Sequence, residues 1–121
     1  MTDAATLAAR YIALWNETDP NRRRALLADG WDVDASYADP LMSGRGHEQI
    51  AALIGAVHKR FPGFRFELDG RIDSLDDKVR FSWALGPAGQ PDVIKGTDFA
   101  VIEGGRIKAV TGFLDKVPAG A

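Results

Sequence analysis

Residues 93–115 decide the fold, and they read VIKGTDFAVIEGGRIKAVTGFLD. Two strand-like runs, 93–103 and 106–115, flank Gly104-Gly105, and a glycine pair between two such runs predicts a two-residue β-hairpin. Before the hairpin, residues 79–85 alternate apolar and polar side chains, as half-buried strands do, and residues 64–69 do the same. The second half of the chain therefore predicts consecutive antiparallel strands.

The first half predicts three helices and one strand. Apolar residues recur at helical spacing from Leu7 to Trp15, and Asp19-Pro20 supplies an N-cap and a first-turn proline for a second, short helix. A third apolar stripe runs through residues 50–61 and ends before Pro62-Gly63. Residues 31–39 alternate as a strand, and residues 41–46 are expected to form a loop.

Helices followed by strands are typical of an α+β domain with the helices on one face of a sheet. The 121 residues are expected to form one domain, 1–121. The sheet must curve strongly to bury its aromatic residues against only three helices. We therefore expect a cone-shaped curved antiparallel sheet with an interior pocket.

Composition excludes several functions. Fifteen basic residues against seventeen acidic ones give a net charge of −2, which predicts no general attraction to nucleic acid or to a membrane surface. Arg22-Arg23-Arg24 is expected to be a solvated helix face. The absence of cysteine excludes thiolate chemistry and Cys-ligated zinc, and we expect no metal or cofactor. No signal peptide or membrane-length run is visible, so a cytoplasmic location is expected.

Two acids and one tyrosine are the main candidates for chemistry. Asp98 interrupts an apolar strand, so burial is expected to raise the pKa of its carboxyl group. Asp39 shares the inward parity of Tyr37, although an aspartate before a proline also caps turns. Tyr11 lies on the apolar face of the first helix, where a core tyrosine with a satisfied hydroxyl is the alternative.

Further residues are expected to line the pocket. His58 lies at the edge of the third helix's apolar stripe, and Asp115 ends the last strand with the parity of Phe113, although Asp115 could instead exit to solvent. The full set of expected ligand-binding residues is Trp15, Tyr37, Met42, Ile54, His58, Phe61, Phe66, Trp83, Phe113 and Asp115.

Several short motifs resemble the SnoaL-like branch of the nuclear transport factor 2-like superfamily. They are Tyr37-Ala38-Asp39-Pro40, the helix start at 46–50, Phe61-Pro62-Gly63-Phe64-Arg65-Phe66 and the closing Phe113-Leu114-Asp115. The resemblance spans about residues 5–117. It implies a cone-shaped α+β barrel with an internal pocket, often dimeric through the outer sheet face, so a homodimer is expected.

Within this superfamily, ketosteroid isomerases use a helix tyrosine, a base aspartate before a proline and a strand aspartate. Tyr11, Asp39 and Asp98 match those positions in order and context. The resemblance thus implies cofactor-free proton transfer on an apolar carbonyl compound, with Asp39 as base and with Tyr11 and a protonated Asp98 as hydrogen-bond donors.

Three alternatives stay open. SnoaL-type polyketide cyclases carry their catalytic acid near the last strand, which would make Asp115 the base. Epoxide hydrolases of the superfamily need an inward arginine, for which Arg45 and Arg80 are the remaining candidates. A non-catalytic ligand-binding or dimerisation domain is the third, and a pure dimerisation domain predicts a cone completely filled by aromatic side chains.

Overall fold

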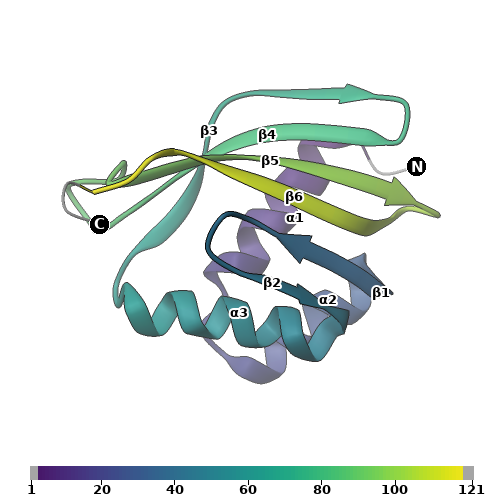
Figure 1. Ribbon diagram of the computed structural model, residues 1–121, viewed down its shortest axis with the longest axis horizontal. Coiled ribbons are helices and arrows are strands. Elements are labelled where there is room, and N and C mark those ends of the chain that lie inside the picture. The colour runs from purple at the N-terminus through teal and green to yellow at the C-terminus, as the bar shows by residue number, and fades with distance from the viewer. Residues whose placement is uncertain (1–2, 119–121) are drawn as a thin grey trace.

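The computed structural model describes residues 3–118, which form three helices and six strands (Figure 1). In chain order these are α1 (Ala4–Asn16), α2 (Pro20–Gly30), β1 (Trp31–Ala38), β2 (Ser43–Arg45), α3 (Gly46–Arg60), β3 (Arg65–Leu75), β4 (Lys78–Gly86), β5 (Ile94–Glu103) and β6 (Arg106–Lys116). The predicted α+β class is confirmed.

The first two helices begin where the sequence places N-caps. The Asp3 carboxylate accepts a hydrogen bond from the Thr6 amide at 2.7 Å, and the Asp19 carboxylate accepts one from the Arg22 amide at 3.1 Å. Each bond satisfies an amide that has no partner within the helix. Pro20 lies in the first turn of α2, where its missing N–H costs nothing.

The sheet is mixed and open, which corrects the expectation of a purely antiparallel sheet. Its strand order is β2-β1-β6-β5-β4-β3, and β1 runs parallel to β6 while every other neighbouring pair is antiparallel. The segment expected to be a loop contains β2, a three-residue strand that pairs Ser43 with Ala38. So short a strand carries too little alternation to be seen in the sequence.

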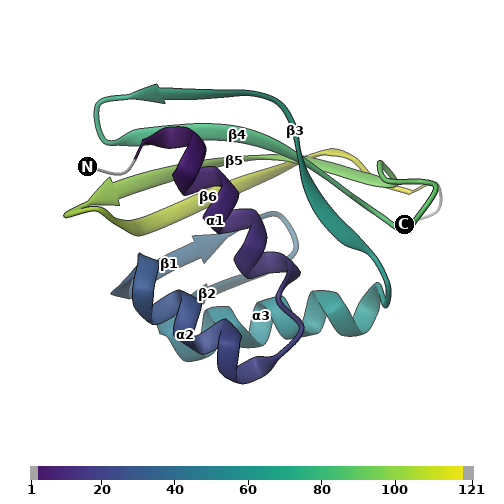
Figure 2. The ribbon, with the colours of Figure 1, turned by 180° about the vertical axis from the view of Figure 1, so that it is seen from behind.

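The sheet bends around α1, which crosses its concave side (Figures 1 and 2). Three strand pairs contain a register shift: β1 with β6, β3 with β4, and β5 with β6. Such bulges increase local twist and bend a strand. The buried core lies on this concave side, between the sheet and the three helices.

A bulge in β6 reverses the side-chain parity expected from simple alternation. In β6, Ile107 pairs with Ile102 but Ala109 pairs with Val101, so Lys108 is an extra residue. After it, Val110, Gly112 and Leu114 face inward, and Phe113 faces outward with 53% of its surface exposed. Irregular pairing in β1 leaves Val33 72% exposed, whereas Trp31, Ala35 and Tyr37 stay buried as alternation predicts.

Between residues 3 and 118, no helix combines the length and the apolar character needed to cross a membrane.

Candidate functional site

An apolar pocket lies between α1, α3, the β1 end and the inner face of the sheet. Its cavity volume is about 70 Å³, which is room for several water molecules. Its lining residues are Tyr11, Trp15, Tyr37, Asp39, Leu41, Met42, Val57, Phe61, Phe66, Trp83, Leu85, Ile94, Asp98 and Leu114. A completely filled cone, which a pure dimerisation domain predicts, is therefore not what the structure has.

Asp98 reaches the pocket from the middle of β5. Its inward neighbours in the strand are Gly96 and Ala100, and its side chain is only 2% exposed. Oδ2 accepts a hydrogen bond from the Tyr11 hydroxyl at 2.6 Å, whereas Oδ1 is buried and has no partner among the described residues.

The environment of Asp98 alters its protonation. Burial disfavours the charged carboxylate and raises the pKa of Asp98 to about 6, and the negative charge of Asp39 adds to the rise. The hydrogen bond from Tyr11 and the nearby Trp83 side chain act in the opposite direction. Burial and the Asp98 charge also raise the pKa of the Tyr11 hydroxyl well above its usual value, so Tyr11 stays a donor.

Asp39 forms a second tyrosine–aspartate pair at the end of β1. Its Oδ2 accepts from the Tyr37 hydroxyl at 2.6 Å, while Oδ1 accepts from the amides of Leu41 at 2.8 Å and Met42 at 2.9 Å. Asp39 is thus both a turn cap and a pocket residue, so the two sequence interpretations are compatible. A carboxylate has about four acceptor positions, and these bonds leave one of them, on Oδ2, for a ligand.

The two acids flank one glycine on β6. A Cβ atom built on Gly112 would lie 2.6 Å from Asp98 Oδ1 and 3.5 Å from the Cβ of Asp39. Contacts as short as the first do not occur between real side chains. The missing side chain at Gly112 therefore provides the space in which the Asp98 carboxyl group lies.

Aromatic rings make up much of the pocket wall. Trp15 contacts Tyr37 and Phe66, with ring centroids 5.2 and 5.7 Å apart, and Phe66 meets Trp83 edge to face at 5.3 Å. The Trp83 indole lies over Gly96, where an added Cβ would approach it to 2.2 Å. The Trp15 Nε1 group is buried without a partner within residues 3–118, so an indole N–H donor is free.

His58 and Ile54 do not line the pocket, which corrects two predicted positions. Ile54 is fully buried in the core, and Val57 of the same helix reaches the pocket instead. His58 Nε2 lies 2.5 Å from the Trp15 carbonyl oxygen, and Nδ1 lies 3.2 Å from Arg23 Nη2. Because a carbonyl can only accept, Nε2 carries the proton and Nδ1 accepts from Arg23.

Arg23 is buried, contrary to the solvated face expected for Arg22-Arg23-Arg24. Its guanidinium group donates to the carbonyl oxygens of Glu17 at 2.9 Å and Thr18 at 3.4 Å as well as to His58. Arg23 precedes the buried Leu27 by one helical turn, and this spacing is the sequence feature that could have identified it. His58 and Arg23 thus fix the turn behind Trp15 rather than the pocket itself.

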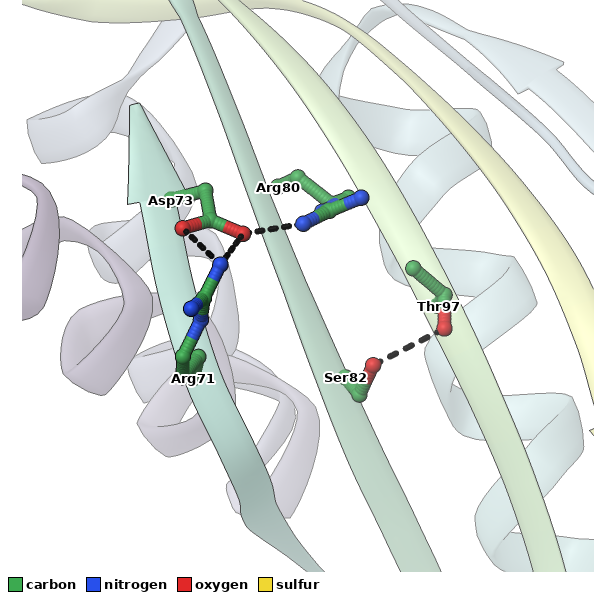
Figure 3. Close-up of polar contacts among 5 residues, drawn as sticks. All are labelled: Arg71, Asp73, Arg80, Ser82 and Thr97. Carbon is green, nitrogen blue, oxygen red and sulfur yellow. Dashed lines mark hydrogen bonds and ion pairs between the residues drawn. The ribbon is translucent and has the colours of Figure 1, made fainter. Parts of the chain in front are cut away.

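Phe113 and Asp115 lie on the outer sheet face, which corrects their predicted place in the pocket. The cause is the extra residue Lys108, which shifts the parity of the strand after it. Asp115 is exposed and accepts a hydrogen bond from the Thr97 hydroxyl at 2.7 Å. The Thr97 hydroxyl lies 2.9 Å from Ser82 Oγ (Figure 3). Because the Thr97 hydroxyl donates to Asp115, Ser82 donates to Thr97.

The same face carries the arginine considered for an epoxide-hydrolase network. Arg80 forms an ion pair with Asp73, which also binds Arg71 at 3.2 Å (Figure 3). Among the described residues, no arginine, lysine or histidine lines the pocket, and no group of three or more acidic or histidine side chains is arranged to hold a metal ion.

Five lining residues were not predicted: Leu41, Val57, Leu85, Ile94 and Leu114. Leu85 and Ile94 are opposite each other in the β4–β5 ladder, and Leu114 faces inward only because of the bulge in β6. Apolar alternation alone could have indicated Leu85 and Ile94. The inward position of Leu114 can be found only from the pairing register of β6 with β5.

Comparison with known proteins fits this architecture. A family model for the SnoaL-like domain matches residues 8–110. The chain belongs to the SnoaL-like family. A structure from this family, from Agrobacterium tumefaciens strain C58 and provisionally described as an isomerase, is 46% identical, with 95% of this chain and 99% of that chain covered and a TM-score of 0.89.

More distant structures share the fold of this SnoaL-like chain. A protein of Kribbella flavida, provisionally described as a ketosteroid isomerase, is 18% identical, with 95% and 79% of the two chains covered and a TM-score of 0.69. A Jannaschia protein, provisionally described as a SnoaL-like polyketide cyclase, is 14% identical, with 95% and 92% covered and the same TM-score. No curated protein matches the sequence.

Proposed function

We propose that this SnoaL-like protein binds a small apolar carbonyl compound and transfers a proton next to its carbonyl group without a cofactor. One observation supports this proposal above all: two tyrosine–aspartate pairs, Tyr11–Asp98 and Tyr37–Asp39, face one apolar pocket. The provisional isomerase description of the Agrobacterium relative is in line with it.

Asp39 acts as the base in this proposal. The free acceptor position on Oδ2 takes a proton from the carbon beside the carbonyl, which leaves an enolate, and the same carboxyl returns the proton to the same carbon or to a conjugated one. No atom is lost or gained, and the product is an isomer or an exchanged ketone. The three hydrogen bonds to Asp39 hold its carboxylate in one orientation, as a positioned base requires.

Asp98 in its protonated form stabilises the enolate oxygen. Oδ2 already accepts from Tyr11, so the proton resides on Oδ1 and is donated from there to the substrate oxygen. Tyr11 lies beside this position and becomes a second donor when the substrate oxygen displaces its bond to Oδ2.

A cyclase reaction with Asp115 as base is less well supported, because Asp115 lies on the outer sheet face and bonds to Thr97. A ligand-binding module without chemistry would use the same apolar walls. It differs from our proposal in predicting no catalysed proton exchange.

The proposal is tested by proton exchange in D₂O. Cyclohexanone is incubated with the protein, and loss of the hydrogens beside the carbonyl is followed by NMR. We expect the wild type to accelerate exchange and Asp39→Asn to lower the rate by about 10²- to 10⁴-fold, the usual contribution of a general base.

Asp115→Asn is the matched control, since it removes one carboxylate from the outer face, and it should leave the rate within about twofold. Equal exchange in the wild type and in Asp39→Asn would eliminate Asp39 as the base. Ligand binding without any accelerated exchange would support the non-catalytic alternative.

We also infer that the chain forms a homodimer through its outer sheet face. Phe99 and Phe113 are both substantially exposed there and meet edge to face at 5.9 Å. Exposed aromatic pairs of this kind are typical anchors of protein interfaces. The cytoplasmic location suggested by the sequence stays a prediction.

A further inference from the structure

The pocket wall is negatively charged as well as apolar. Two of its lining residues, Asp39 and Asp98, are acids, and among the described residues no basic side chain reaches the pocket to neutralise them. Tyrosine, tryptophan and phenylalanine rings form much of the remaining wall. Carboxylates and aromatic rings both attract cations, and aromatic cages are used to recognise ammonium groups.

Asp98 supplies a specific partner for such a cation. Its side chain is 98% buried and lines the pocket, and Oδ1 has no hydrogen-bond donor within residues 3–118. A buried carboxylate oxygen without a donor is costly, because the water that would have bonded to it has been removed. A ligand that donates an N–H to Oδ1 would restore this bond as a charge-assisted one.

From this arrangement we propose that the pocket binds a small protonated alkylamine, with its N–H group on Asp98 Oδ1 and its alkyl part against the aromatic wall. This proposal goes beyond the proposed proton transfer, since it requires only the shape and charge of the pocket and no catalytic step.

The balance of desolvation favours the amine over a neutral ligand of equal shape. An ammonium ion loses hydration on entering, and burial of an ion pair does not stabilise by default. Here, however, the carboxylate is already desolvated by folding, so the ligand loses only its own hydration and meets a preformed partner. We expect the ammonium to bind about tenfold more tightly than its neutral counterpart.

Amine binding should depend on pH in a defined direction. The groups that act on Asp98 are Tyr11 from α1, Tyr37 and Asp39 from the β1 end, Trp83 from β4 and, at longer range, Asp115 from β6. Both tyrosine hydroxyls have raised pKa values and stay neutral, while the amine stays protonated throughout. The Asp98 carboxyl has a pKa raised to about 6, so amine affinity should fall as the solution is acidified through that pH.

The test compares cyclohexylammonium chloride with cyclohexanol by calorimetry at pH 8 and pH 5. The two probes have the same ring and each can donate a hydrogen bond, but only the first is charged. We expect a preference of about tenfold for cyclohexylammonium at pH 8, a clear loss of that preference at pH 5, and unchanged affinity for cyclohexanol. These measurements use the wild type and do not depend on any variant folding.

Asp98→Asn should abolish the preference at pH 8, and Asp115→Asn, which removes an outer-face charge, should retain it. Equal binding of both probes at pH 8 would overturn the proposal, and so would a preference lost in Asp115→Asn but kept in Asp98→Asn. The amine-binding test and the proton-exchange assay can give different outcomes. Proton exchange without a preference for the amine would reject only the amine-binding proposal. A preference for the amine without proton exchange would reject only the proposed catalysis.

Discussion

Adjacent residues of β5, Asp98 and Thr97, lead to acids in opposite environments on the two faces of the sheet. On the inner face, Asp98 is buried, receives one hydrogen bond from Tyr11 and has a pKa raised to about 6. On the outer face, Thr97 donates to Asp115, an exposed acid, and accepts from Ser82. The difference shows that strand parity, rather than residue type, separates a candidate reactive acid from a surface one.

The two faces also differ in what burial does to stability. Asp98 lowers stability, because a desolvated carboxylate destabilises the native state whenever it is charged. The outer face instead exposes apolar surface, at Phe99 and Phe113, that would be stabilising only if a partner covered it. Each face can therefore be changed without changing the other.

The largest expected effect lies on the outer face. Phe113→Asp introduces a charge into the aromatic patch, and we expect the dimer dissociation constant to rise by about 30- to 900-fold, as truncation of an aromatic anchor costs about 2–4 kcal/mol. Light scattering after size-exclusion chromatography measures the change in mass. Proton exchange in the pocket should persist.

Leu75→Asp is the control for this change, because Leu75 is an equally apolar, exposed residue at the end of β3. It should leave the dimer intact. A wild type that is monomeric at micromolar concentrations would contradict the inferred interface, as would a fully dimeric Phe113→Asp.

A smaller effect is expected on the inner face, in the pH dependence of stability. Burial raises the pKa of Asp98 from 3.8 to about 6, so between these values the native state binds a proton that the unfolded chain has released. Stability from this group is therefore present in acid and is lost as the pH rises through 6, by about 3 kcal/mol. Asp98→Asn removes the charge and should be more stable than the wild type at pH 8, by up to about 3 kcal/mol.

Urea unfolding at pH 4 and pH 8 measures this difference, which should nearly vanish at pH 4. Asp115→Asn should change stability by less than about 0.5 kcal/mol at either pH, since the residue is exposed. An Asp98→Asn protein that is less stable than the wild type at pH 8 would show that the buried carboxylate is not a net cost.

Much of the fold follows from the sequence because its features are local. Helical spacing from Leu7 to Trp15, the Asp19-Pro20 start and the Gly104-Gly105 hairpin each depend on neighbours in the chain, and each is present in the structure. The parallel pairing of β1 with β6 joins strands about 70 residues apart, and nothing local specifies it.

The residues of the candidate site also differ in whether local sequence features or strand pairing determine their positions. Asp98 interrupts a strand that is apolar on both faces, so its burial was expected whichever face it occupied, and the structure buries it. Phe113 and Asp115 follow a bulge, and the one-residue offset moves both out of the pocket while bringing Leu114 into it. A bulge depends on the partner strand, so alternation in a single sequence cannot reveal it.

The same bulge turns Gly112 inward, against the Asp98 carboxyl group. An added Cβ would lie 2.6 Å from Asp98 Oδ1, so Gly112→Ala must displace the carboxyl group within a packed interior. We expect a loss of about 1–3 kcal/mol in stability, typical of overpacking, together with slower proton exchange.

Gly30→Ala is the control, because a Cβ there meets nothing within 4 Å. If the clash with Asp98 is the cause, then combining Gly112→Ala with Asp98→Ala should cost less than the sum of the two single changes in urea unfolding. Additive costs would mean that Gly112 serves the backbone of β6 rather than the Asp98 carboxyl group.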